Sequence, residues 1–306
     1  MSNEQQPHAI EVALTVAEIA NEPLAGSRGK ILLVEDNLVN QAVALGMLQK
    51  MQGYDVVVAN NGNEALEDYK LGGFDIILMD CHMPELDGFE ATMEIRRIEH
   101  ASNRHRIPII ALTANAMAQD RQDCLDAGMD DHLAKPLSRK QMQDMLDRWM
   151  PKTVVPTQPG ALESLGVAPR SDVDVLDRQV LSQLRELQNA DDPDLLGRVL
   201  KLYLVESPKL LARMKQVTEQ GDLLEIERTA HSLKSSSGNV GATELTRLCG
   251  DIHLAARASD LGRTRDKFAK AEAEFRHVVS ALNTEISHIA AASEGMATGS
   301  APLRRA

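Results

Sequence analysis

What the sequence lacks narrows the class of protein. Its three cysteines (Cys81, Cys124 and Cys249) are odd in number and form no CxxC pair, which excludes a disulfide framework or a thiolate zinc site and fits a reducing cytosol. No apolar stretch approaches the ~20 residues of a membrane span. Aromatic residues make up only 3% of the chain, although hydrophobic residues at 43% suffice for globular packing.

Basic residues are also in short supply. Lys and Arg number 33 against 45 Asp and Glu, a formal charge of −12, which argues against a nucleic-acid backbone or an anionic membrane as the main partner. The apolar run from Ala9 to Ala20 carries Glu11 and Glu18 and lacks a basic flank, so it is no signal peptide. We expect a soluble cytoplasmic protein of two domains, because a domain has roughly 150 residues.

The first half of the chain alternates between strand-like and helix-like segments. Between the strand-like runs lie segments with helical period, such as Val39-Val43-Met47-Met51. This alternation predicts a doubly wound, three-layer α/β domain with a five-stranded parallel sheet covered on both faces. The expected strands are Ile31–Val34, Tyr54–Val58, Phe74–Met79, Ile107–Leu112 and, more weakly, Asp131–Ala134.

The second half has a different pattern. Residues 1–28 are expected to form a flexible leader, and residues 151–174, with four prolines, a linker. After Leu176 the sequence contains only helix-length amphipathic segments, which predict an all-α antiparallel bundle. Pro208 is expected to kink or split its helix, and residues 291–306 to form a disordered tail. The expected helices span approximately 177–189, 193–219, 222–237, 242–258 and 262–289.

Five polar side chains stand at the predicted strand ends. Glu35 and Asp36 follow the first strand, Asp80 the third, Thr113 the fourth and Lys135 the fifth. The carboxyl ends of parallel strands meet at one edge of the sheet, where ligands bind. Clustered carboxylates repel unless they share a cation, and oxygen ligands suit Mg²⁺. A carboxylate beside Mg²⁺, an ammonium and a hydroxyl is a plausible phosphoryl acceptor, although a single strand-end acid is more often a helix N-cap.

Four segments in the first half of the chain resemble those of a known family. ILLVEDNLVN, IILMDCHMPELDGFE, IIALTANA and HLAKP resemble the receiver domain of two-component response regulators, over residues 28 to 150. The resemblance implies a flavodoxin-like sheet with strand order 2-1-3-4-5 and a domain over 29–150. It also implies that Asp80 is the phosphoacceptor, and that Glu35, Asp36, Asp80 and the backbone carbonyl of His82 hold Mg²⁺.

The resemblance also assigns the switch residues. Thr113 resembles the hydroxyl that moves onto the phosphoryl group, and Lys135 its ion-pairing partner. Lys135-Pro136 resembles a bond that is cis in the family. His132 stands where the family commonly has a Tyr or Phe switch ring, which puts the usual aromatic read-out in doubt.

A histidine marks the second half. Leu223, Ile226, Ala230 and Leu233 recur at helical spacing and should face the bundle core. His231 lies off that seam, and Lys234, Ser235 and Gly238 share its stripe. Small residues let another protein's carboxylate edge approach, and a lysine can neutralise a phosphoryl group. Taken alone, however, His231 is more simply a solvent-facing histidine near a helix end.

The segment HSLKSSSGNVGA resembles the pattern of histidine phosphotransfer (HPt) domains, over about 175 to 290. The resemblance implies a four-helix-bundle domain in which His231 is phosphorylated and Lys234, Ser235 and Gly238 form its docking stripe. Ser235 stands where many members have glycine. His253 and His277 lack comparable neighbours and are read as ordinary helix residues.

The combined reading is a phosphorelay protein. Asp80 would accept phosphate from a phosphohistidine, and His231 would exchange phosphate with a receiver aspartate. No Gly-rich ATP-binding segment is visible, so the expected partners are an upstream sensor histidine kinase and a downstream response-regulator receiver. Three alternatives remain open: a non-transferring binding module, a phosphate sink that regulates a separate kinase, and, most weakly, a small-molecule enzyme.

The linker bears on whether Asp80 and His231 exchange phosphate with each other. A tether over 151–174 neither forbids nor enforces docking. Its prolines stiffen it, and in-line geometry must also be met. We therefore expect the two domains to work mainly in trans.

Overall fold

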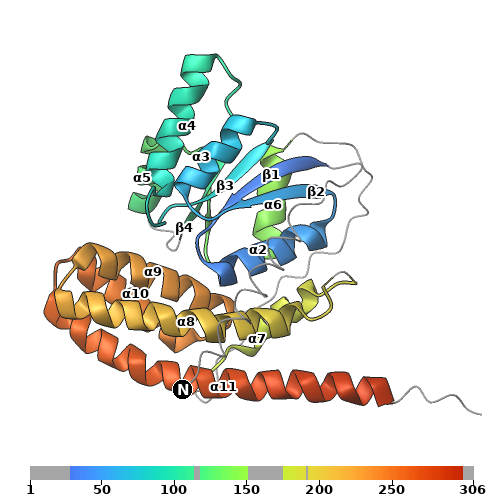
Figure 1. Ribbon diagram of the computed structural model, residues 1–306, viewed down its shortest axis with the longest axis vertical. Helices are drawn as coiled ribbons and strands as arrows, with labels where there is room; N and C mark the ends of the chain where they lie inside the picture. The colour runs from blue at the N-terminus through green and yellow to red at the C-terminus, as the bar shows by residue number, and fades with distance from the viewer. Residues whose placement is uncertain (1–27, 114–117, 151–174, 191, 299–306) are drawn as a thin grey trace, which may run out of the picture.

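The computed structural model describes residues 28–113, 118–150, 175–190 and 192–298. The expected leader up to residue 27, the linker over 151–174 and the last residues of the expected tail, 299–306, lie outside the described residues. Two bodies lie one above the other in Figure 1: an α/β domain and, below it, a bundle of helices.

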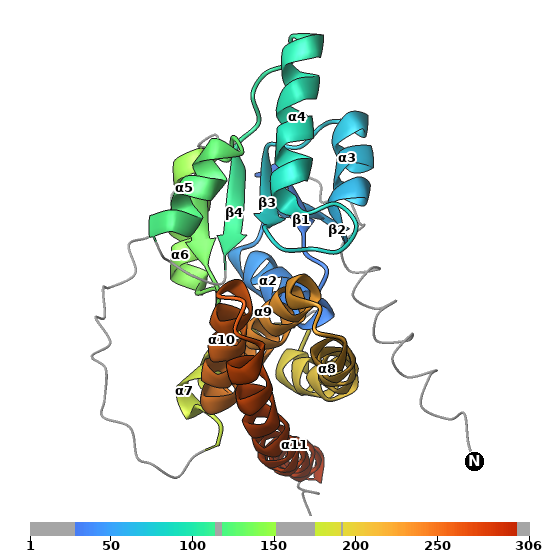
Figure 2. The same ribbon diagram turned by 90° about the vertical axis from the view of Figure 1, so that its left-hand side faces the viewer.

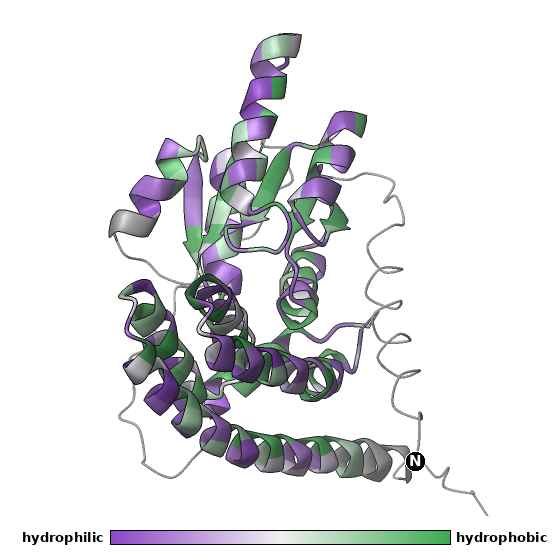
Figure 3. Ribbon diagram, turned by 60° about the vertical axis from the view of Figure 1, so that its left-hand side comes forward, coloured by the Kyte–Doolittle hydropathy of each residue, from purple (hydrophilic) through white to green (hydrophobic). Residues whose placement is uncertain are grey.

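The α/β domain is built on a parallel sheet of five strands in the order β2-β1-β3-β4-β5. The prediction of a doubly wound sheet with the order 2-1-3-4-5 is therefore confirmed. The inner strands are continuous apolar runs, drawn in green in Figure 3. Such runs are expected where helices cover both faces of a parallel sheet. The strands are β1 (Gly29–Val34), β2 (Tyr54–Ala59), β3 (Ile76–Asp80), β4 (Ile109–Thr113) and β5 (Asp131–Ala134).

Alternate residues of each strand belong to two separate apolar clusters. Ile31 and Leu33 of β1 pack with α2 and α6, whereas Leu32 and Val34 pack with α3 and α4. This period of two follows from the pleat, which points successive side chains to opposite faces. The helices of this domain are α2 (Leu38–Met51), α3 (Gly62–Leu71), α4 (Gly88–Ser102), α5 (Ala118–Asp126) and α6 (Arg139–Trp149).

The second body consists of helices alone within the described residues. The expectation of a helical bundle is confirmed. Asp222 caps the start of α9 by accepting from the backbone of Glu225, and Tyr203 of α8 bonds Ser237 of α9 inside the bundle at 2.9 Å. The helices are α7 (Arg178–Leu187), α8 (Leu195–Gln220), α9 (Leu223–Asn239), α10 (Thr243–Arg257) and α11 (Leu261–Thr298).

Two local expectations for the bundle differ from the structure. Helix α8 is continuous through Pro208, so of the two expected outcomes, a kink or a split, the split is wrong. The residue is exposed, while Tyr203 and Met214 on either side are buried and hold both halves in the bundle. Helix α11 runs to Thr298, so residues 291–298 continue a helix rather than a disordered tail. Their sequence, AASEGMAT, contains several strong helix formers, which the interpretation as a tail overlooked.

Helix α2 joins the two bodies. Every residue from Val39 to Leu48 is buried, and one apolar cluster continues from the sheet through α2 into α7, α8 and α9. Gly46 of α2 lies so close to Leu195 of α8 that an added Cβ would come within 2.6 Å of it. Figures 1 and 2 both show α2 between the sheet and the bundle. A helix with apolar residues on all of its faces is typically buried on all sides, and α2 is buried in this way from Val39 to Leu48.

Candidate functional site

The predicted strand-end carboxylates converge. Ligand atoms of Glu35, Asp36 and Asp80 lie within 4.8 Å of one another at the carboxyl edge of the sheet. Burial, followed by repulsion from Asp80, raises the pKa of Glu35 to about 8 and that of Asp36 to about 7. The site is thus short of positive charge, and its all-oxygen donor set fits the divalent cation expected there.

Lys135 supplies one positive charge from the neighbouring strand end. Its ammonium donates to Asp80 Oδ2 at 2.7 Å and to Glu35 Oε2 at 2.6 Å. The two carboxylates raise the pKa of Lys135 above its ordinary value despite the opposing effect of burial. A permanently charged ammonium therefore holds Asp80 in one orientation.

Of the remaining predicted switch residues, Thr113 lies at the site and His132 lies away from it. Thr113 ends β4, is buried, and its carbonyl accepts from the backbone of Lys135. The Lys135–Pro136 peptide bond is cis, as the resemblance implied. His132 lies on β5 with its Nδ1 3.7 Å from Asp131 and does not line the cavity beside Asp80.

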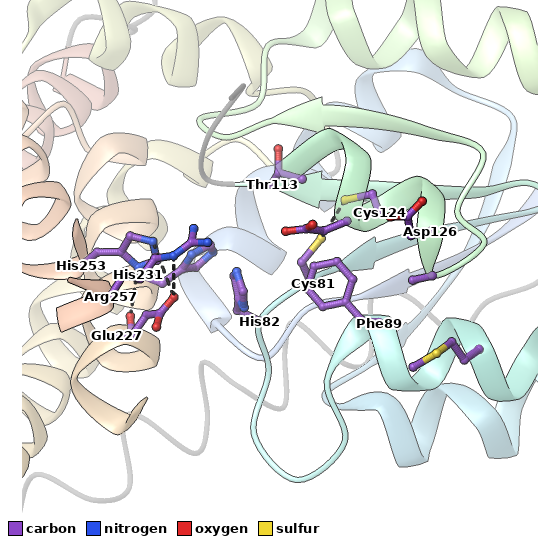
Figure 4. Close-up of a pocket in the computed structure, with 13 residues that line it drawn as sticks. Cys81, His82, Phe89, Thr113, Cys124, Asp126, Glu227, His231, His253 and Arg257 are labelled. Atoms are coloured by element: carbon purple, nitrogen blue, oxygen red, sulfur yellow. Dashed lines mark hydrogen bonds and ion pairs between the residues drawn. The ribbon is translucent and has the colours of Figure 1, made fainter. Parts of the chain in front are cut away.

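The loop after Asp80 folds back tightly on the strand end. The backbone of Gly88 donates to the carbonyl of Cys81 at 3.1 Å. A Cβ at Gly88 would come within 2.0 Å of the backbone oxygen of Asp80, so only glycine fits this approach. His82 lies within this turn, between His231 and Cys81 in the close-up (Figure 4).

The bundle places His231 against the acidic cluster. The Nε2 atom of His231 lies 4.0 Å from Asp80 Oδ1, and the histidine is only 4% exposed. Within the described part of the chain this nitrogen has no hydrogen-bond partner. Burial, followed by the nearby His82 ring, lowers the pKa of His231 well below its ordinary value. The buried histidine is thus a neutral imidazole facing the carboxylate, not a solvent-facing side chain.

Two further imidazoles accompany His231. The rings of His82 and His231 meet edge to face at 4.5 Å, and the ring of His253 lies 5.9 Å from His231. These rings line a cavity of about 460 Å³ that opens between the two bodies, shown in Figure 4. His253 is 3% exposed. His253 was expected to lack such neighbours, and this expectation is wrong, because α10 places its ring near the other two.

The three residues of the predicted docking stripe lie in different surroundings. Gly238 faces the receiver side, since its Cβ position lies 3.8 Å from the ring of Pro136. Ser235 is buried, with its hydroxyl unbonded among the described residues. Lys234 lies along α10, where its Cδ and Cε are 3.8 Å from the Cβ position of Gly250. Small residues thus stand where the two bodies approach.

The sequence interpretation missed the polar contacts between the bodies. Asn37 donates to Ser232 at 2.9 Å, and Asn239 donates to Asn40 at 2.8 Å. The signal that could have revealed docking is the composition of α2, LVNQAVALGMLQKM, which carries apolar residues on more than one face. The expectation that the domains work apart rested on a stiff linker, but the structure brings Asp80 and His231 face to face.

Family models match both halves of the chain. The model of the response regulator receiver domain matches residues 31–147, and that of the Hpt domain matches residues 198–292. In the part of the chain that the structure describes, no helix is both long and apolar enough to span a bilayer.

Curated relatives include hybrid sensor kinases. Hybrid signal transduction histidine kinase B of Dictyostelium discoideum is 51% identical over 35% of this chain and 6% of its own length. The aerobic respiration control sensor protein ArcB of Escherichia coli is 30% identical over 92% of this chain and 35% of its own length. The chain thus spans about a third or less of the length of these relatives.

Matches are also found among solved structures. The receiver domain of the sensor histidine kinase PA1611 from Pseudomonas aeruginosa, crystallised with a coordinated magnesium ion, is 50% identical and covers 41% of this chain and 98% of its own, with a TM-score of 0.37. The complex of the Saccharomyces cerevisiae phosphotransfer protein Ypd1 with the receiver of Ssk1 gives a match at 33% identity over 42% of this chain and 92% of the matched chain, with a TM-score of 0.38. The chain carries a response regulator receiver domain followed by an Hpt domain, the two modules of two-component phosphorelay signal transduction.

Proposed function

We propose that this chain passes a phosphoryl group between Asp80 and His231 of the same molecule. The observation that carries the proposal is the 4.0 Å separation of His231 Nε2 from Asp80 Oδ1 inside a buried interface. That gap is too long for a hydrogen bond, and an in-line transfer places phosphorus between the attacking and leaving atoms. The proposed relay residues are Asp80 and His231, with Thr113 and Lys135 contacting the phosphoryl oxygens.

The transfer balances without any further reactant. The lone pair of His231 Nε2 attacks phosphorus, a P–N bond forms, the P–O bond to Asp80 breaks, and Asp80 leaves as a carboxylate. The ring proton stays on Nδ1. The lowered pKa of His231 keeps its nucleophilic nitrogen unprotonated at neutral pH. The reverse step uses the same atoms, so the geometry supports transfer in both directions.

The acidic cluster and Lys135 prepare the aspartate. Glu35, Asp36, Asp80 and the backbone carbonyl of His82 would hold Mg²⁺, which supplies positive charge next to the transferring oxygens. Lys135 fixes Asp80 through the 2.7 Å hydrogen bond and would neutralise a phosphoryl oxygen. The proposed outside partners are a sensor histidine kinase and the receiver of a response regulator, in the cytoplasm, where free cysteines such as Cys81 persist.

The two phosphorylated forms differ in chemical stability, which gives a direct test. Full-length protein is treated with acetyl phosphate, with and without Mg²⁺, and its label is divided into acid-stable and acid-labile fractions. We expect acid-stable aspartyl phosphate first and acid-labile phosphohistidine later. Asp80→Asn should abolish both, whereas His231→Gln should keep the first and lose the second.

Other outcomes favour other functions. Label that persists in Asp80→Asn would contradict the assignment of the acceptor. Aspartyl phosphate that is lost to water without any phosphohistidine would indicate a phosphate sink. A His231→Gln protein that kept its signalling role in cells would indicate a non-transferring binding module.

A further inference from the structure

Two buried asparagines connect the bodies away from the reacting atoms. Asn239, the last residue of α9, donates from Nδ2 to Oδ1 of Asn40 in α2 at 2.8 Å. The two side chains are buried, with 7% and 5% of their surface exposed. A buried pair of amides stabilises an interface only when its donors face acceptors. The neighbouring groups therefore determine which way each amide is oriented.

The other end of Asn40 determines that orientation. Its Nδ2 donates to Glu35 Oε1 at 2.8 Å. The second oxygen of Glu35 accepts from Lys135, so the partners of this carboxylate are donors. Asn40 must therefore present its oxygen to the bundle, and only a donor at position 239 completes the pair.

The contacts form one route from the bundle to the phosphoacceptor. Helix α9 reaches Asp80 directly through His231 and also through this hydrogen-bonded chain. Because His231 and Asn239 lie two turns apart on one helix, the two contacts fix both the position and the rotation of α9 over the site. The chain runs through Asn239, Asn40, Glu35, Lys135 and Asp80.

We propose that Asn40 and Asn239 are positioning residues that clamp α9 in the register in which His231 faces Asp80. The clamp makes the chain's own Hpt domain the resting partner of its receiver, because Asp80 is only 2% exposed while the bundle is docked. An outside phosphodonor reaches Asp80 only when the clamp opens. This inference rests on the proposed exchange between Asp80 and His231, and it adds the residues that select the partner.

The test uses full-length protein and two rates that move in opposite directions. Acetyl phosphate with Mg²⁺ labels Asp80, and the later rise of acid-labile phosphate reports transfer to His231. Asn239→Ala should slow the transfer about fivefold to tenfold, as expected for one lost hydrogen bond, and should speed the labelling of Asp80 because the site opens. General damage to the fold would instead slow both steps.

A substitution of the same size, Asn239→Asp, separates the effect of the hydrogen bond between Asn40 and Asn239 from the effect of side-chain packing. In Asn239→Asp, a carboxylate faces the oxygen of Asn40, and turning the Asn40 amide would set its oxygen against Glu35. This variant should therefore transfer about tenfold more slowly than Asn239→Ala, although it fills the same space. Combining Asn40→Ala with Asn239→Ala should cost no more than the larger single effect. Asn283→Ala removes an exposed amide that, among the residues that the structure describes, bonds within α11, and serves as the matched control.

A measurement without phosphate separates this inference from the proposed function. Amide hydrogen exchange in α2 should be faster in Asn239→Ala and Asn239→Asp than in the wild type or Asn283→Ala. If the wild type forms no phosphohistidine, the proposed function fails, while exchange in α2 still reports the clamp. Unchanged exchange together with an unchanged rate of Asp80 labelling would overturn the clamp. Additive effects of the two alanine changes would also overturn it.

Discussion

Asp80 and His231, the two residues proposed to carry the phosphoryl group, lie 4.0 Å apart in very different surroundings. Asp80 stands among charges: burial and repulsion from Asp80 raise the pKa of both Glu35 and Asp36, and Lys135 bonds Asp80. His231 stands among imidazoles and small residues, with no hydrogen bond to its Nε2 in the described residues. Under the proposed function, the receiver would carry the groups that stabilise a phosphoryl group, whereas the Hpt helix would contribute the nucleophile and the space for its approach.

The two sides of the proposed relay therefore depend on different parts of the chain. The chemistry depends on a few charged residues fixed at the ends of strands, and the partnership depends on a broad apolar helix, α2, with polar contacts at its edge. Damage to the first should abolish phosphorylation, and damage to the second should leave the chemistry intact but separate the partners.

Removing the charge at the aspartate side should have the largest effect. Lys135→Met deletes the ammonium that bonds both Asp80 and Glu35, and should slow the labelling of Asp80 by acetyl phosphate about 100-fold or more. Lys140→Met is the control, since Lys140 is exposed and pairs only with Asp144 among the described residues. A Lys135→Met rate close to that of the control would contradict the role of the ammonium.

The histidine side should respond to pH through His253. Burial lowers the pKa of His253 to about 4, whereas the unfolded chain takes up this proton near 6.5. Protonation therefore favours the unfolded state, and the contribution of His253 to the free energy of unfolding should fall by about 3 kcal/mol as the pH drops from 6.5 to 4.

Denaturant titrations at several pH values test this prediction. His253→Gln should make the dependence between pH 4 and pH 6.5 shallower by the share of His253, while the share of His231, whose pKa is also lowered by burial, remains. His277→Gln should keep the wild-type slope, because His277 is exposed on α11. Equal slopes in all three proteins would show that His253 is not held neutral by the fold.

A larger side chain at the apolar contact between α2 and α8 should separate the receiver from the helical bundle. Gly46→Val places a side chain where a Cβ already comes within 2.6 Å of Leu195, and overpacking of this kind costs about 1–3 kcal/mol. We expect small-angle scattering to show a larger radius of gyration while acetyl phosphate still labels Asp80. Gly262→Val makes the same change on exposed α11 and should leave the scattering unaltered. A compact Gly46→Val protein would mean that α2 does not hold the bundle.

The smallest effect is expected at the edge of the interface. Ser232→Ala removes the hydroxyl that accepts from Asn37 at 2.9 Å, and one such hydrogen bond contributes about 1 kcal/mol. Transfer from Asp80 to His231 should slow about fivefold, in keeping with that energy. Ser287→Ala, which removes an exposed hydroxyl bonded within α11, should show no change. A larger loss in Ser232→Ala than in Asn239→Ala would shift the centre of the clamp to Asn37.

Sequence reasoning predicted the acidic site well because its residues are placed by strand ends. Parallel strands bring their carboxyl ends to one edge, so Asp36, Asp80 and Lys135 had to converge once the strands were recognised. His231 was found from its stripe and its family pattern.

The interface could not be predicted in the same way. Whether Asn40 bonds Asn239 depends on how the two bodies meet, and the period of four along α2 does not say which body that face contacts. Val43 and Met47 line a pocket together with Leu184 of α7, so this apolar face lies toward the bundle and not only toward the sheet. His253 was missed because its neighbours come from α9 and from the receiver loop, far from it in the chain.

The central claim is that phosphate moves within one chain. The measurement compares wild-type protein with an equimolar mixture of full-length Asp80→Asn and full-length His231→Gln, both labelled by acetyl phosphate and diluted in steps. Wild type should form phosphohistidine at a first-order rate that does not change with dilution, well above the rate of the mixture, which should fall in proportion to concentration. Equal rates that fall together on dilution would contradict the account and show that the domains act in trans.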